Sequence, residues 1–551
     1  MKAAHYRVAA VLTVLILLGV GGAPLAPHSI GHAAHLTVAP APARGGTVID
    51  GLFAEPDRLI PNTSTLWSSG AVAQTLFAPL FYTDDQSRLQ PGLAAEIPSL
   101  ANGDISHDGR TYIFKLRPGL QWSDGQPLDA RDVDYSWKTW TNKDLIVATR
   151  LGLDQISSAT LSTDNLSITF HLKAPYAPFV SIWTDLALPL PAHVLSKMSA
   201  QDLNTSAFTF SPTVSSGPFM IVSRTKGDSI VEVRNPHYYQ PGRPYLDKLI
   251  FRMIPDQVAL TNALSAHEID CAWFLSVAQL HTLQHIDGYT LVVSPHPGSE
   301  EGVLNLRNPI LQDVRVRQAL EYGLDRFAMV RDVWRGLATP LASNEPPTMF
   351  SYTPGVKPYP FDPARAARLL DAAGWKLGPD GHRHKDGTLL SLRYSTTSRN
   401  AWRAQDELIA LQDFRNLGID LRIVNYPSDT YIHILSNGDY DIGEIQFFWA
   451  YDPDVASANV LQSNRWPPHG SNYSHYSSTA YDALLATEES ATDVARRRAI
   501  FARMQRLLNH DLPSLWLYSP PTLAAHSNTL HNYAPASFSG ETWNTWNWWK
   551  D

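Results

Sequence analysis

The segment from Ser106 to Trp140, SHDGRTYIFKLRPGLQWSDGQPLDARDVDYSWKTW, most constrains what this chain can fold into. Its first part alternates, and places Tyr112, Phe114 and Leu116 on one face of a half-buried strand. Arg-Pro-Gly at 117–119 ends this strand, and Ser-Asp-Gly at 123–125 predicts a second tight turn. The segment therefore predicts scaffold, because it holds no nucleophile–base pair and no metal-ligand spacing.

A helix is predicted directly after the second turn. Asp129 has the character of a helix N-cap, and Asp132 lies three residues on, where a carboxylate favours the positive helix start. Apolar residues then recur at helical spacing, at Val133, Trp137 and Trp140. A strand, two turns and a capped helix thus follow one another within 35 residues.

This string resembles the signature segment of the peptide/nickel family of extracellular solute-binding proteins, with DGRTYIFKLRPGLQWSDGQPLDARDV similar almost throughout. Members of that family capture ligands for importers driven by ATP hydrolysis. The resemblance implies an α/β fold with two lobes, a hinge and an extra subdomain in the first lobe. It also implies a membrane permease as the partner, and it names no ligand.

The N-terminus predicts an export signal. Lys2 and Arg7 precede the short apolar run 8–20, which is shorter than the roughly 18 residues that span a bilayer. Small residues at 41–43 or 33–34 offer cleavage sites, and an uncleaved membrane anchor is the alternative. No cysteine follows the apolar run, unlike the lipoprotein relatives, so we expect an exported protein, periplasmic or associated with the cell surface without a lipid-bearing cysteine.

The chain is long enough for several domains. With the resemblance, we assign 1–43 to signal and linker, 44–298 to the first lobe with a subdomain at about 94–210, 299–519 to the second lobe, and 520–551 to a return into the first lobe. In the second lobe, the helix at 363–372 is sharply bounded by Asp362, Pro363 and Gly374. Helices alternate there with strands, which favours an α/β lobe.

Composition and motifs exclude several functions. The net charge of −8 lacks basic runs, so nucleic-acid binding is not expected. The sequence has no nucleophile elbow, phosphate loop or zinc-protease motif, so we predict no enzyme, no cofactor and no metal. The single cysteine, Cys271, is expected to be a buried small apolar residue. We expect a monomer.

The best candidate ligand site is the run 447–454, FFWAYDPD, which follows a predicted strand. Ligands bind at strand C-termini in α/β lobes. The resemblance implies that Asp452 receives a peptide's α-ammonium, with Asp454 as the fallback. The alternative is that Asp452 caps a helix starting near Val455.

Two further sets of residues complete the predicted site. By resemblance to dipeptide binders, Arg399 and Arg403 would hold a peptide carboxylate, whereas the alternative is a solvated helix start. Trp449, Tyr451 and Trp466 could line the cleft with aromatic surface.

We therefore predict the substrate-binding subunit of an ABC importer, which closes around a peptide and hands it to a permease. Aromatic walls also suit sugar rings, so an oligosaccharide-binding member of the same family is the first alternative. A secreted hydrolase with paired carboxylates is the second.

Overall fold

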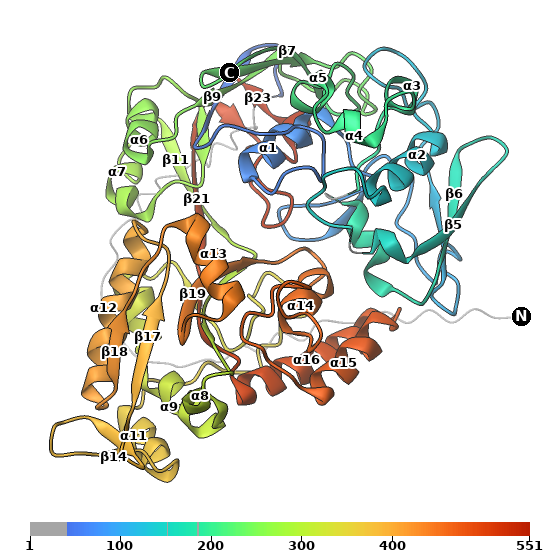
Figure 1. Cartoon of the computed structure of the whole chain (residues 1–551). Coiled ribbons are helices and arrows are strands. Elements are labelled where there is room, and N and C mark those ends of the chain that lie inside the picture. The colour runs from blue at the N-terminus through green and yellow to red at the C-terminus, as the bar shows by residue number, and fades with distance from the viewer. Residues whose placement is uncertain (1–40, 151, 185–186) are drawn as a thin grey trace, which may run out of the picture. The chain divides into compact units, whose positions relative to one another are not determined.

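The computed structural model describes residues 41–150, 152–184 and 187–551. The predicted signal, the apolar run and most of the linker lie outside the described residues. Within the described part, no helix combines the length and the apolarity that crossing a bilayer requires. Residues 42–551 contain two large sheets, which form the cores of two lobes (Figure 1).

The first lobe is built on a seven-stranded mixed sheet. Its order is β11 (Tyr289–Pro295), β21 (Pro521–Ser527), β10 (Cys271–Trp273), β1 (Thr47–Leu52), β9 (Lys248–Met253), β8 (Ser229–Arg234) and β7 (Phe219–Thr225). The central strand β1 runs parallel to both of its neighbours, β9 and β10. The helices α1 (Trp67–Leu76) and α6 (Gln257–Ser265) belong to this lobe.

The signature segment forms the strand and the capped helix that its pattern predicts, and it lies in a small sheet of its own. The strands β4 (Thr111–Lys115), β6 (Ser167–Leu172) and β5 (Ile156–Leu161) make an antiparallel sheet. Tyr112, Phe114 and Leu116 are all buried. The helix α2 (Ala130–Thr141) starts with a complete capping box between Asp129 and Asp132, which confirms the predicted start.

The second lobe has a six-stranded mixed sheet. The order is β13 (Thr339–Pro340), β20 (Ser514–Ser519), β12 (Gly298–Leu304), β19 (Ile442–Phe448), β17 (Ser391–Ser395) and β18 (Asp420–Ile423). Its helices include α9 (Val314–Gly323), α11 (Pro363–Ala372), α12 (Ala401–Asn416), α13 (Ser428–Asn437), α14 (Asp454–Leu461), α15 (Thr479–Glu489) and α16 (Val494–Asp511). The sharp bounds predicted for α11 are confirmed, since Asp362 caps its first turn.

The chain passes between the two sheets twice. Residues 296–297 separate β11 from β12, and Pro520 separates β20 from β21. In Figure 1 the strand β21 runs from the lower lobe into the upper one. Two short neighbouring connections are the usual construction of a hinge. The fold is thus the predicted two-lobed α/β fold with a subdomain in the first lobe.

Candidate functional site

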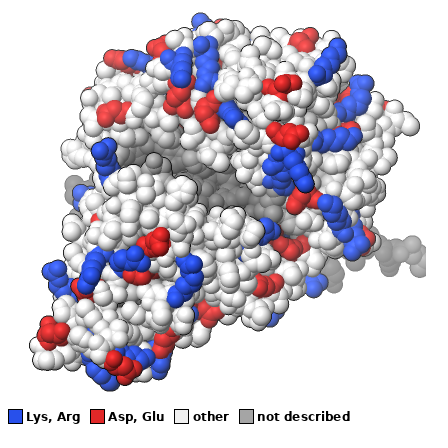
Figure 2. Space-filling model, viewed as in Figure 1, with Lys and Arg blue, Asp and Glu red and all other residues white. Residues whose placement is uncertain are grey.

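A cavity of about 380 Å³ lies beside the two crossings and is lined by both lobes. Figure 2 shows a hollow between the two halves of the molecule, and uncharged residues make up most of its rim. The cavity's aromatic lining comes from Phe53, Trp67 and Phe274 in the first lobe and from Trp334, Trp402 and Phe448 in the second. None of the described residues that line it is Asp, Glu, Lys or Arg.

Aromatic rings bridge the two lobes at this cavity. Trp67, at the start of α1, lies 5.7 Å from Phe448, at the end of β19, between ring centroids. Trp67 also contacts Trp273 and Phe274, each at 5.5 Å. Phe448 is 43% exposed although it is a large apolar residue at the end of a sheet strand. Its ring is therefore available to a ligand between the lobes.

Trp67, Phe274, Phe448 and His296 form an aromatic wall at this cavity. His296, in the first crossing, adds no charge to the wall. Burial lowers the pKa of His296 to about 3, so its ring is neutral at physiological pH. The ring stands edge-on to Phe448 with 5.0 Å between centroids. The wall thus offers ring faces and edges, with few polar groups.

A second cavity of about 250 Å³ extends the site along α1. It shares Trp67 with the first cavity and reaches Asn62, Trp273 and Phe538. Arg58 and Glu541 are its only acidic or basic lining residues among those described. Burial raises the pKa of Glu541 to about 8, so Arg58 is the main source of charge here.

The predicted ammonium ligand Asp452 is paired within the protein. Both of its carboxylate oxygens accept hydrogen bonds from Arg497 of α16, at 2.6 and 2.8 Å. Arg497 also pairs with Glu488. Asp452 is only 3% exposed, so a ligand ammonium would meet a carboxylate that already has a countercharge. Its role in binding stays a prediction.

The hydrogen-bond geometry gives only weak support to the alternative that Asp452 caps a helix. The helix α14 begins at Asp454, and its cap position is Pro453, which makes no side-chain cap bond. Asp452 accepts from the Asp454 backbone N–H at 3.3 Å. The fallback Asp454 is itself buried, and burial raises its pKa well above the ordinary value, so its ligand role also stays a prediction.

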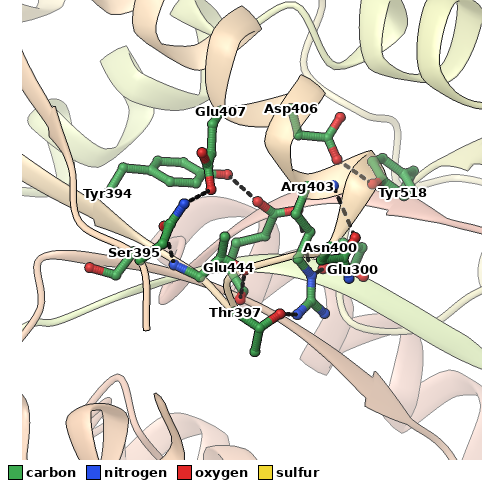
Figure 3. Close-up of polar contacts among 12 residues, drawn as sticks. Glu300, Tyr394, Ser395, Thr397, Asn400, Arg403, Asp406, Glu407, Glu444 and Tyr518 are labelled. Carbon is green, nitrogen blue, oxygen red and sulfur yellow. Dashed lines mark hydrogen bonds and ion pairs between the residues drawn. The ribbon is translucent and has the colours of Figure 1, made fainter. Parts of the chain in front are cut away.

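Arg403 lies inside the second lobe and not in solvent (Figure 3). Its Nε donates to Glu300 of β12 at 2.6 Å, and its Nη1 donates to Thr397 at 3.0 Å. The expected alternative, a solvated helix start, is therefore wrong for Arg403. Arg399 is exposed on the loop before α12, with a positive φ of 68°. Contact of either arginine with a ligand carboxylate stays a prediction.

The three predicted aromatic contacts have different surroundings. Trp449 is buried and donates its ring N–H to Ser299 at 3.1 Å. Tyr451 meets Phe538 of the C-terminal segment edge-on, at 5.7 Å, so it joins the lobes. Trp466 is 40% exposed and packs on His475. The described lining of the two cavities includes none of the three.

Sequence reasoning missed Trp67, Phe274 and His296, which form the wall together with Phe448. Phe448 belongs to the predicted run 447–454, but the other three lie far from it in sequence. Their one shared feature is position, since Trp67 begins α1, Phe274 follows β10 and His296 lies in a crossing. That position becomes informative only after the strand order is known.

The fold and the cleft define a class of protein: a two-lobed binding protein that encloses a small solute. The chain matches the family model of the bacterial extracellular solute-binding proteins, family 5, over residues 88–467. It belongs to this family, which confirms the resemblance seen in the sequence.

Known proteins that are similar to the chain support this assignment. Protein XP55 of Streptomyces lividans is 29% identical, with 88% of this chain and 87% of that protein covered. The oligopeptide-binding protein AppA of Bacillus subtilis is 24% identical, with 89% of each covered. Its structure with a nonapeptide superposes with a TM-score of 0.76 and covers 93% of this chain and 100% of AppA. The glutathione-binding protein GsiB of Pectobacterium atrosepticum is 26% identical, with 84% and 87% covered.

Proposed function

We propose that this protein captures peptides in the cleft between its lobes and delivers them to the membrane permease of an ABC importer. The observation that carries the proposal is the aromatic wall, almost free of charge, at the crossings of a family 5 solute-binding fold. The similarity to AppA and GsiB, whose names specify peptide ligands, supports the same ligand class.

The wall suits a ligand with varied side chains. Ring faces accept apolar and aromatic groups without demanding one hydrogen-bond pattern, and Trp67 and Phe448 offer such faces from opposite lobes. A ligand that touches both rings stabilises the closed arrangement over the open one. The work of the protein is then differential affinity for the closed state, and no bond is made or broken.

The proposal also places the protein outside the cell and has it act as a monomer. The family is extracellular by definition, and the predicted export signal at 1–43 agrees with that location. The ligand contacts proposed for Asp452, Asp454, Arg399 and Arg403 are separate from the wall. Their failure would leave the ligand class unchanged.

The decisive experiment is mass spectrometry of the small molecules released by denaturing the purified protein. We expect one or more short peptides in near-stoichiometric amount. Titration of the stripped protein with the identified peptide should change its tryptophan fluorescence, because Trp67 lies in the wall. Recovery of an oligosaccharide, or hydrolysis of the added ligand, would overturn the proposal in favour of one of the two alternatives.

A further inference from the structure

Three side chains that could hold a metal ion meet at the first-lobe sheet. They are Asp50 of β1, Cys271 of β10 and Glu541 of the C-terminal segment. Each offers one ligand atom, and these atoms lie within 4.8 Å of one another. All three side chains are buried, at 0%, 0% and 1% exposure.

The sheet register brings the first two together. β1 and β10 are parallel neighbours, and Asp50 stands opposite Cys271, so both side chains project from the same face. The C-terminal segment packs on this face through Tyr533 and Trp548, which share a core with Cys271. Glu541 enters from that segment. Cys271 is buried, as predicted, and two carboxyl groups are among its neighbours.

The unpaired carboxylate of Asp50 points to a bound ligand. Beyond the Cys271 thiol, a weak donor, neither of its carboxylate oxygens has a hydrogen-bond partner among the described residues. By contrast, Glu541 accepts a hydrogen bond from the Tyr533 hydroxyl. A fully buried carboxylate without a strong donor is costly, and a proton or a cation must compensate it.

We propose that Asp50, Cys271 and Glu541 bind one divalent metal ion of the zinc type where the C-terminal segment meets the first-lobe sheet. One thiolate and two carboxylates favour Zn²⁺ or Co²⁺ over the hard ions Mg²⁺ and Ca²⁺. Three protein donors leave a fourth tetrahedral position open. Glu541 also lines the cavity of about 250 Å³ along α1, which gives an ion a route to the site.

The site would join parts of the chain that are remote in sequence. Asp50 and Cys271 are 221 residues apart, and Glu541 follows 270 residues later. A bound ion would therefore fasten the C-terminal segment to the sheet. Burial raises the pKa of the Cys271 thiol well above its ordinary value. An ion that binds the thiolate displaces this proton.

The test uses the mature protein after treatment with a chelator, titrated with Co²⁺ alone and then with Zn²⁺ alone. We expect one equivalent of Co²⁺ to bind and to produce a sulfur-to-cobalt charge-transfer absorption. Since Cys271 is the only cysteine, this absorption identifies the site without ambiguity. Zn²⁺ should bleach the absorption and raise the midpoint of thermal unfolding by several degrees.

Two variants should separate this site from other metal-binding groups. Cys271→Ser should abolish the absorption, and Asp50→Asn should weaken Co²⁺ binding at least tenfold. The matched control is Glu232→Gln, which alters another fully buried carboxyl on the same sheet, one that Thr75 already hydrogen-bonds. This control should bind as the unaltered protein does. The absence of a sulfur signature in the unaltered protein, or equal binding by all variants, would overturn the proposal whether or not the variants fold.

Discussion

The cleft wall and the interior of the second lobe differ in their charged side chains, which are nearly absent from the wall and present in the interior. In the wall, Trp67 and Phe274 are half-buried, Phe448 is exposed and His296 is buried, and the lining is nearly without charge. The interior of the second lobe, by contrast, holds buried arginines paired with carboxylates, among them Arg403 beside Glu300, and Arg497 beside Asp452 and Glu488.

This contrast assigns different tasks to the two regions. Buried ion pairs fix one arrangement, because a lone charge in the interior is very costly. Exposed rings leave the ligand free to vary, because apolar contact has little directional demand. Charge thus positions the second-lobe elements, and we propose that ring surface selects the ligand.

The largest expected effect comes from breaking the Arg497 cluster. Arg497→Leu leaves Asp452 and Glu488 buried without their countercharge, so we expect the free energy of unfolding to fall by about 3–5 kcal/mol. Urea unfolding at neutral pH measures this change. Arg496→Leu, an exposed neighbour on α16, should change stability by less than about 0.5 kcal/mol. Equal losses in the two variants would show that Arg497 is not a stabilising centre.

The next effect should appear in ligand affinity alone. Trp67→Ala removes the ring that faces Phe448, and central aromatic contacts typically contribute about 2 kcal/mol or more to binding. We therefore expect affinity for the co-purified peptide to fall about 30-fold or more. Trp137→Ala, which alters a half-buried ring on α2, should leave affinity unchanged. Undiminished binding by a folded Trp67→Ala protein would remove the wall from the site.

Local elements were predictable from the sequence because their signals lie within a few residues. The capping box at Asp129 and Asp132, and the helix bounded by Asp362 and Pro363, were both found. Caps and turns are set by nearby backbone groups, so one window of sequence is enough.

The contacts that define the site were not predictable in the same way. Arg403 and Glu300 are 103 residues apart, and Arg497 and Asp452 are 45 apart. Nothing near either arginine shows whether its partner is a ligand or the protein's own carboxylate. Family resemblance supplied candidates, but burial and pairing depend on strand order, which a single sequence does not reveal.

Buried carboxyl groups of the second lobe can also lose their charge by keeping a proton instead of pairing with an arginine. Glu301 is the group with which we test this. Burial raises the pKa of Glu301 to about 8 from an ordinary 4.5, so between these values the folded state holds a proton that the unfolded state has lost. Stability therefore falls as pH rises through this window, by up to about 1.4 kcal/mol per pH unit for this group. Glu301→Gln should show a correspondingly flatter dependence in urea unfolding from pH 5 to 8. Parallel curves for the two proteins would contradict it.

The smallest expected effect concerns a peptide ammonium at Asp452. Because Arg497 already pairs with this carboxylate, an added ammonium should gain about 1 kcal/mol, the value of a weak ion pair, and not that of a buried one. N-acetylation of the bound peptide should then weaken its binding to the unaltered protein about fivefold. The same acetylation should matter less to Asp452→Asn, whose side chain keeps the shape of the original. Calorimetric titration of both proteins with both peptides measures the coupling. If acetylation has the same effect on the two proteins, the amine is held elsewhere, and the carboxylate serves only to orient Arg497.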